Sequence, residues 1–218
     1  EYIREEVLRA SYDLGISFDG DGDRLLLVSK TGNILDGDDL LYILSKSLNS
    51  ESGVVGTLMT NKALQLHFIE TNIKFCRADV GDKYVLQKLL EESWLLGGEP
   101  SGHIICLDSA QTGDAIIAAL KILESLSGNS FDVDQSIEGF NKFPQTLINL
   151  SVNNPNKIIL NDKFWSEVTI IENRLGEKGR VLIRPSGTEP LIRIMVESEK
   201  EKDSEDYCNR LANLASKL

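Results

Sequence analysis

The chain has 218 residues, of which 23 are Lys or Arg and 34 are Asp or Glu, so its formal net charge is −11. Nucleic-acid binding needs clustered Lys and Arg that displace counterions, and no such basic run occurs. The longest apolar stretch, 115–123, contains Lys121 and is far shorter than the ~20 residues that span a bilayer. We therefore expect neither a nucleic-acid partner nor a membrane partner.

Three cysteines, Cys76, Cys106 and Cys208, are widely spaced and form no CxxC pair. We therefore expect no disulfide framework, no zinc site and a cytoplasmic location. The sequence begins with Glu1 rather than Met, and we expect it to be part of a longer protein.

In the first half of the chain, short apolar runs typical of strands alternate with apolar residues at helical spacing. In chain order, the spacing predicts a helix over 1–10, strands over 14–18 and 25–28, a turn at 31–33, and a helix over 40–48 capped by Asp38. After a linker at 49–53 it predicts strands over 54–58, 73–78, 94–97 and 104–107, and helices over 62–70, 83–92 and 114–126. This alternation is typical of an α/β unit with parallel strands.

The pattern changes near Phe143 and Pro144. A strand over 145–152 is followed by a polar helix from about 155 to 173, strands over 180–184 and 191–196, and a charged C-terminal helix. We expect a second, mixed α+β module here.

An acidic loop lies between the first two predicted strands, where Asp19, Asp21 and Asp23 alternate with glycines. In extended geometry residues i, i+2 and i+4 lie on one side, so the three carboxylates could converge on one point. Converging carboxylates repel unless a cation lies among them, and oxygen ligands favour Mg²⁺, Mn²⁺ or Ca²⁺ over zinc. We predict a metal site rather than a solvated turn. An EF-hand is excluded because Arg24 and Lys30 stand where Gly and Glu are required.

A second loop brings Glu99, Ser101 and His103 into one Gly- and Pro-containing turn. A carboxylate with a hydroxyl suits adjacent sugar hydroxyls, because these both donate and accept hydrogen bonds. Taken alone, such a loop is more often a simple surface turn.

A third loop, Arg-Pro-Ser-Gly-Thr-Glu-Pro, begins at Arg184. It supplies the hydroxyls of Ser186 and Thr188 and the backbone N–H groups around Gly187, and Arg193 follows on the next strand. This set can surround a phosphate dianion, although a β-turn with incidental polar residues fits equally well. Walker A and GxGxxG patterns are absent from the sequence, which argues against a nucleotide cradle.

The three loops in this order resemble those of the α-D-phosphohexomutase family. Residues 19–24 resemble its metal loop, 98–103 its sugar loop and 184–189 its phosphate loop, and the likeness covers essentially the whole chain. It implies mixed-sheet α/β domains followed by a small α+β domain resembling the TATA-box-binding protein. Residues 1–49 would end domain 2, 50–143 would form domain 3, and 144–218 would form domain 4.

Within the family, the segments most similar to members acting on glucosamine phosphates are 55–61, 80–85, 143–145 and 186–193. The resemblance implies an isomerase that interconverts glucosamine 6-phosphate and glucosamine 1-phosphate through a phosphoserine and a 1,6-bisphosphate. That product would feed UDP-N-acetylglucosamine and cell-wall precursor synthesis. Pro100 replaces the usual Gln or Asn, which leaves glucose or mannose phosphates open as substrates.

The family's phosphoserine loop does not occur in this sequence, so we expect the chain by itself to be inactive. The resemblance further implies one Mg²⁺ per site and glucose or glucosamine 1,6-bisphosphate as activator, and it leaves a homodimer open.

By the same resemblance, each loop has a role. The expected metal ligands are Asp19, Asp21 and Asp23, and Arg24 would steady the transferring phosphoryl group. The residues expected to contact the sugar or support its loop are Glu99, Ser101 and His103. Those expected to hold the non-reacting phosphate are Arg184, Ser186, Gly187, Thr188 and Arg193. Lys83 is the candidate general acid or base, against the alternative of a solvated helix-start lysine.

A second class of enzyme also fits the acidic loop. In haloacid-dehalogenase-like phosphatases an Asp at a strand end is the nucleophile and the Asp two residues later is the acid or base, as Asp19 and Asp21 would be. This alternative leaves the second and third loops unexplained.

Overall fold

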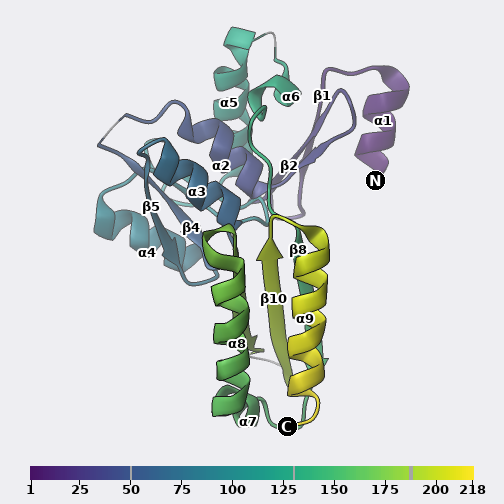
Figure 1. The fold of residues 1–218 in the computed structure, drawn as a ribbon. Helices are drawn as coiled ribbons and strands as arrows, with labels where there is room; N and C mark the ends of the chain where they lie inside the picture. Colours follow the sequence, from purple (N-terminus) through teal and green to yellow (C-terminus); the bar gives the residue numbers. More distant parts are fainter. Residues whose placement is uncertain (50, 130, 187–188) are drawn as a thin grey trace. The chain divides into compact units, whose positions relative to one another are not determined.

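The computed structural model describes residues 1–218 except 50, 130, 187 and 188. The chain divides into two compact units, Glu1–Phe140 (unit 1) and Asn141–Leu218 (unit 2) (Figure 1). Each unit is described by itself. The domain boundaries predicted at residues 49 and 143 stay predictions.

Unit 1 begins with a small antiparallel sheet whose strand order is β1-β2-β3. Its strands are β1 (Leu14–Phe18), β2 (Leu25–Ser29) and β3 (Ile34–Leu35), and helix α1 (Tyr2–Ala10) precedes them. A Cβ on Gly15 would lie 2.6 Å from a methyl group of Val7, so the missing side chain at Gly15 allows α1 to lie close against the strand.

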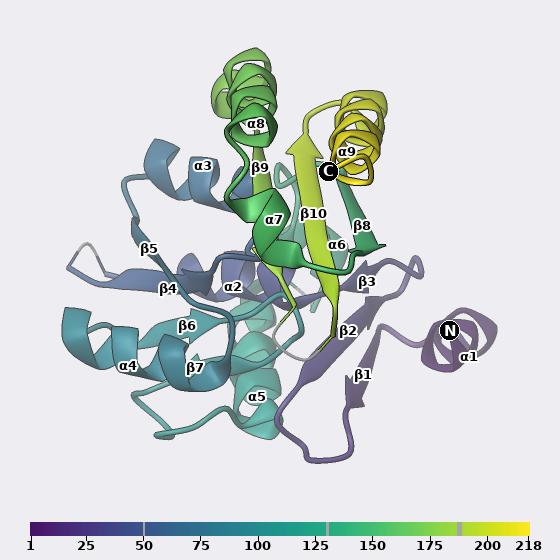
Figure 2. The same ribbon diagram turned by 90° about the horizontal axis from the view of Figure 1, so that it is seen from below.

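The second sheet of unit 1 has the order β5-β4-β6-β7, and only β7 is antiparallel to its neighbour. The strands are β4 (Gly53–Thr57), β5 (Lys74–Ala78), β6 (Leu96–Gly98) and β7 (Ile104–Cys106). Helix α3 (Lys62–Glu70) lies on one face of this sheet and α4 (Asp82–Glu92) on the other (Figure 2). Every residue of β4 is buried, as expected for a strand covered on both faces. The α/β class predicted from sequence is confirmed.

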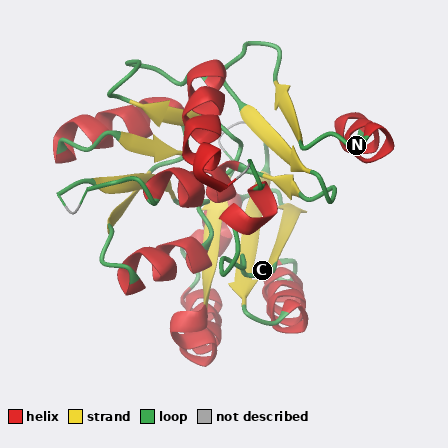
Figure 3. Cartoon of the chain, turned by 90° about the horizontal axis from the view of Figure 1, so that it is seen from above, coloured by secondary structure: helices red, strands yellow, loops and turns green. Residues whose placement is uncertain are grey.

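The remaining helices of unit 1 are α2 (Gly37–Ser45), α5 (Ala115–Leu126), η1 (Ser127–Asn129) and α6 (Val133–Ser136). Figure 3 shows how helices and strands are distributed over the chain. The predicted cap of α2 is wrong by two residues. The side chain of Asp36, not Asp38, accepts from the first-turn backbone, and Asp39 completes a capping box. Asp38 instead lies inside the first turn, where its carboxylate accepts from the Asn61 N–H.

Unit 2 is a three-stranded antiparallel sheet of order β8-β10-β9 with helices on one face (Figure 1). Its elements are β8 (Gln145–Ser151), α7 (Pro155–Ile159), α8 (Asp162–Leu175), η2 (Gly176–Lys178), β9 (Gly179–Pro185), β10 (Leu191–Ser198) and α9 (Glu201–Ala215). The single helix predicted over 155–173 is two helices, because Asn161 starts a new one by accepting from the Phe164 N–H. The predicted α+β module is otherwise confirmed.

The core of unit 2 lies between its sheet and helices α8 and α9. Alternate residues of the strands, such as Ile148, Ile183 and Ile194, face this core with Phe164 and Leu211 from the helices. Since side chains alternate along a strand, the intervening residues lie on the opposite face of the sheet. Asn149, Arg184 and Arg193 belong to that second set.

None of the helices in the described part of the chain is long and apolar enough to cross a membrane.

Candidate functional site

The acidic loop is bent rather than extended. Gly22 has a φ of +73°, and Oδ1 of Asp19 accepts from the backbone N–H groups of Gly22, Asp23 and Arg24 at 3.1, 3.2 and 3.2 Å. Nε of Arg24 lies 3.8 Å from the other carboxylate oxygen of Asp19. The i, i+2, i+4 geometry assumed from sequence is therefore wrong, because Asp19 turns back on its own loop.

The electrostatics of Asp19 follow from these contacts. Desolvation raises the pKa of this carboxyl, but hydrogen bonds from Arg24, Asp23 and Gly22 together outweigh it, so the pKa lies below its ordinary value. The loop is thus built to keep Asp19 ionised.

The three aspartates supply the oxygen atoms that a hard cation prefers as ligands, but their arrangement suits a cation less well. All three supply only oxygen donors, and Oδ1 of Asp23 is a buried oxygen for which the described residues provide no hydrogen-bond partner. Asp19 and Asp21 are exposed. Among the described residues, however, no three His, Cys, Asp or Glu side chains are grouped so as to hold a metal ion. The structure therefore offers a partial ligand set, and the metal assignment stays a prediction.

The structure brings the acidic loop and the Glu99 loop together within unit 1. Arg24 and His103 form an antiparallel bridge, and the Leu25 N–H donates to the carbonyl of Gly102 at 3.0 Å. Nδ1 of the buried His103 lies 3.2 Å from a carboxylate oxygen of Asp23. A Cβ on Gly113 would overlap the His103 ring, so this histidine is enclosed beneath the two loops and supports them.

The Glu99 loop is held on two further sides. Oε1 of Glu99 accepts from the backbone N–H of Gly81 at 2.9 Å, at the N-terminus of α4, where the helix dipole favours a carboxylate. The carbonyl of Pro100 accepts from the Gly37 N–H at 3.1 Å. Ser101 is exposed at the tip. Lys83, two residues after Gly81, is exposed and lies with Nζ 4.6 Å from the ring of Tyr84.

Unit 2 places two arginines side by side. Arg184 on β9 and Arg193 on β10 are direct cross-strand partners, and Asn149 on β8 is the partner of Arg193 on its other side. Burial lowers the pKa of Arg184, and the charge of Arg193 lowers it further. Nε of Arg193 is buried and has no hydrogen-bond partner among the described residues. Like charges directly opposite each other destabilise a sheet, so a bound anion would stabilise this pair of arginines by offsetting their repulsion.

The third loop follows directly after Arg184. Arg184 and Arg193 together are called the arginine row below. The Ser186 N–H donates to the carbonyl of Leu191 at 2.9 Å, and the Ser186 hydroxyl accepts from the Glu189 N–H at 3.3 Å. Gly187 and Thr188, which we expected to contact phosphate, lie outside the described residues.

The sequence analysis did not single out two residues that lie beside the predicted site residues, Asn149 and Gly81. Asn149 could have been found from the polar–apolar alternation over 145–151, which marks it as a residue of the face opposite the core. Gly81 acts through its backbone N–H, a contact that no motif revealed. The structure joins the first two loops in unit 1 and places the arginines in unit 2.

Comparison with known protein families defines the class to which this chain belongs. Family models for the phosphoglucomutase/phosphomannomutase α/β/α domain III and C-terminal domain match residues 36–143 and 147–214. Together they cover well over half of the sequence, and the chain belongs to this family, the α-D-phosphohexomutases.

Curated relatives are more specific. A phosphoglucosamine mutase of Aeromonas hydrophila is 46% identical over 97% of this chain and 49% of its own length, and one of Pseudomonas fluorescens is 44% identical over 99% and 49%. The chain thus spans about half the length of the curated relatives it matches.

Solved structures share the fold. A phosphoglucomutase/phosphomannomutase family protein from Burkholderia thailandensis matches with a TM-score of 0.82 at 24% identity, over 99% of this chain and 50% of that chain. An Aspergillus fumigatus N-acetylphosphoglucosamine mutase in complex with GlcNAc-6P and magnesium matches with a TM-score of 0.75 at 18% identity, over 98% and 52%.

Family membership leaves the haloacid-dehalogenase-like alternative without support.

Proposed function

We propose that the protein to which this chain belongs is a phosphoglucosamine mutase, which interconverts glucosamine 6-phosphate and glucosamine 1-phosphate. The observation that carries the proposal is the Arg184–Arg193 pair, in a chain of this family. These like charges are cross-strand partners, and the buried Nε of Arg193 meets no hydrogen-bond partner in the described part of the chain. A phosphate dianion would remove the repulsion and accept from both guanidinium groups.

In this proposal unit 2 binds the phosphate that does not react. Arg184 and Arg193 hold it, with Ser186, Gly187 and Thr188 of the following loop as further donors. Binding energy from this remote group orients the reacting end of the sugar, which is how distant contacts raise the rate of a chemical step.

Unit 1 acts on the sugar and the reacting phosphoryl group. Glu99, with one oxygen held by the Gly81 N–H, would accept from a ring hydroxyl through the other, and Ser101 would donate or accept beside it. Because a bisphosphate intermediate has to bind in two orientations, contacts to hydroxyls common to both orientations suit the reaction. His103 fixes the loop from below, and Lys83 remains the proposed acid or base.

We further propose that Asp19, Asp21 and Asp23 hold Mg²⁺, with Arg24 beside the transferring phosphoryl group. When bound, this ion would offset negative charge on the transferring oxygens. Support comes from the oxygen-only donor set and from the buried Oδ1 of Asp23, which has no hydrogen-bond partner within the ranges that the structure describes. Since three ligands from one loop leave coordination positions open, further ligands would come from the phosphoryl group or water.

The test is turnover by the longer protein that contains this chain, with a 1,6-bisphosphate activator. We expect glucosamine 6-phosphate to be converted faster than glucose 6-phosphate or mannose 6-phosphate, and Mg²⁺ removal to abolish turnover. The variant Asp21→Asn should need a higher Mg²⁺ concentration, and the matched control Asp162→Asn on α8 should not.

Faster conversion of glucose or mannose 6-phosphate would overturn the substrate assignment and favour a phosphoglucomutase or phosphomannomutase. The proposal uses residues of one chain, so it does not depend on a homodimer. A cytoplasmic location follows from the proposed role in supplying UDP-N-acetylglucosamine.

A further inference from the structure

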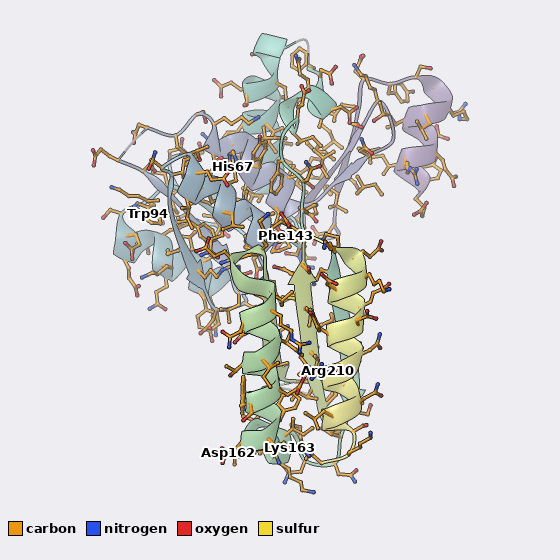
Figure 4. All side chains as sticks on the ribbon, in the orientation of Figure 1. His67, Trp94, Phe143, Asp162, Lys163 and Arg210 are labelled. Atoms are coloured by element: carbon orange, nitrogen blue, oxygen red, sulfur yellow. The ribbon has the colours of Figure 1, made fainter. Side chains whose placement is uncertain are left out.

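The face of the unit 2 sheet opposite the core carries polar residues from all three strands. Helices α8 and α9, on which Asp162, Lys163 and Arg210 are labelled in Figure 4, pack on the other face. Along the central strand β10, Arg193 and Glu197 both belong to the face opposite the core, because they are four residues apart and side chains alternate along a strand. Each of them is the centre of a cross-strand row of three side chains.

The row through Glu197 is balanced in charge. The cross-strand partners of Glu197 are Gln145 on β8 and Arg180 on β9. Nε and Nη2 of Arg180 donate to the two carboxylate oxygens of Glu197 at 2.7 and 2.9 Å, and Glu197 is fully buried. The guanidinium group of this row therefore has its anion within the sheet.

The row through Arg193 has the same order of groups with one change. Asn149 on β8 supplies an amide and Arg184 on β9 a guanidinium, but an arginine takes the place of the central carboxylate. Glu197 cannot serve this row, because four residues along a strand span about 13 Å. Within the described ranges, Nε of Arg193 is buried without a hydrogen-bond partner. The row through Arg193 thus has two positive charges and no anion of its own.

Asn149 lies beside this unpaired nitrogen. Cross-strand neighbours have Cβ atoms about 4.5–5.5 Å apart, so an anion bound at Nε of Arg193 is within reach of the Asn149 side chain. Asn149 is exposed, and its amide oxygen does not accept from Nε of Arg193. The side chain therefore does not serve to fix Arg193. Its two N–H donors can contact an anion without adding a third positive charge.

We propose that Asn149 is a further ligand-binding residue of the phosphate site, and that its amide N–H donates to a non-bridging phosphate oxygen held by Arg193. The inference rests on the proposed function for the identity of the ligand, and every residue that it uses belongs to unit 2. The phosphate dianion does for the arginine row what Glu197 does for Arg180. It offsets the positive charge and accepts from the guanidinium groups, with the amide of the edge strand as a third donor.

The test measures the affinity of the 218-residue chain for inorganic phosphate and for glucosamine 6-phosphate, by NMR titration of the backbone amides of unit 2. In Asn149→Ala we expect both affinities to fall roughly tenfold, since a hydrogen bond to a charged group is lost. Asn149→Asp should weaken both further, because its carboxylate repels the phosphate and pairs with Arg193. The matched control is Asn209→Ala, at an exposed position on α9, which should leave both affinities unchanged.

Urea unfolding separates a binding role from a structural role. Asn149→Ala should leave the free energy of unfolding almost unchanged, because the side chain is exposed. Asn149→Asp should keep or raise it, because opposite charges on neighbouring strands attract each other. Weaker binding in a variant of undiminished stability cannot arise from a disturbed sheet.

Equal affinity in Asn149→Ala and in the parent chain, with weaker binding in Arg193→Met, would overturn this inference and leave the proposed function intact. A loss of affinity for glucosamine 6-phosphate alone would also overturn it, because Asn149 would then contact the sugar rather than the phosphate. Unchanged affinity in Arg193→Met as well would remove the phosphate site and count against the proposed function.

Discussion

The loops of unit 1 and the arginine row of unit 2 are built by different means. In unit 1, backbone groups join the loops, through the Arg24–His103 bridge, the Leu25–Gly102 hydrogen bond and the Gly37–Pro100 hydrogen bond. In unit 2, strand register alone places the side chains of Arg184 and Arg193 next to each other.

Because of this difference, substitutions in the two units should affect the stability of the fold and the binding of ligand to different extents. A change at a loop contact in unit 1 should disturb the fold and the site together, because the same atoms serve both. A change to Arg184 or Arg193 should affect ligand binding alone, because these side chains lie on the face of the sheet opposite the core. Three predictions test this contrast, beginning with the largest effect.

The variant Gly102→Ala should lose stability. Gly102 has a φ of +93°, and a Cβ there would lie 2.2 Å from the carbonyl oxygen of Leu25, so that backbone would have to move. We expect a loss of about 3 kcal/mol or more in the free energy of unfolding, measured by urea titration. The control is Gly128→Ala, where a Cβ would meet no atom within 4 Å. Similar values for the two variants would refute the idea that close backbone contacts build this region.

The variant Arg193→Met should weaken phosphate binding without loss of stability. Losing a charge-assisted hydrogen bond costs about 1.5–3 kcal/mol of affinity, or roughly 10- to 100-fold. Removing one of two opposed like charges should leave the sheet equally stable or slightly more stable. Calorimetric titration with glucosamine 6-phosphate measures the first effect and urea unfolding the second, with Arg174→Met on α8 as control. Unchanged affinity would remove Arg193 from the site.

Each unit also contains one buried thiol whose titration reports on its packing. Burial raises the pKa of Cys106 in unit 1 and of Cys208 in unit 2 to about 11, from an ordinary value of 9.0. Because the folded state favours the protonated thiol, the associated stability is present below pH 9.0 and is lost as the pH rises towards about 11.

The expected loss is on the order of 1 kcal/mol per thiol. It is measured as the change in unfolding free energy between pH 8.5 and about 10.5. Cys106→Ala and Cys208→Ala should each reduce this change. A variant with the same pH dependence as the parent would mean that the thiol of that unit is not buried in solution.

Much of the fold could be predicted from the spacing of apolar residues and from the turn residues that end helices and strands. The alternation of strands and helices over residues 53–126 was predictable because parallel strands read as short apolar runs between amphipathic helices. The helix starts at Asp36 and Asn161 could not be predicted. Several adjacent polar residues could serve as the cap at each start, and the structure alone shows which side chain reaches the backbone N–H. The path of the acidic loop was also missed, since alternation along an extended chain does not hold where Asp19 captures three N–H groups.

The sequence by itself determined the family, the three loops and the residue types available for sugar, phosphate and metal, because motif spacing records which chemistry a loop can supply. Only the tertiary structure decided which groups meet. It buried His103 under two loops, gave Glu99 a partner at Gly81, opposed Arg184 to Arg193 and placed Asn149 beside Arg193. Each of these contacts joins residues separated in sequence, and their distances depend on packing and strand register, which local patterns do not encode.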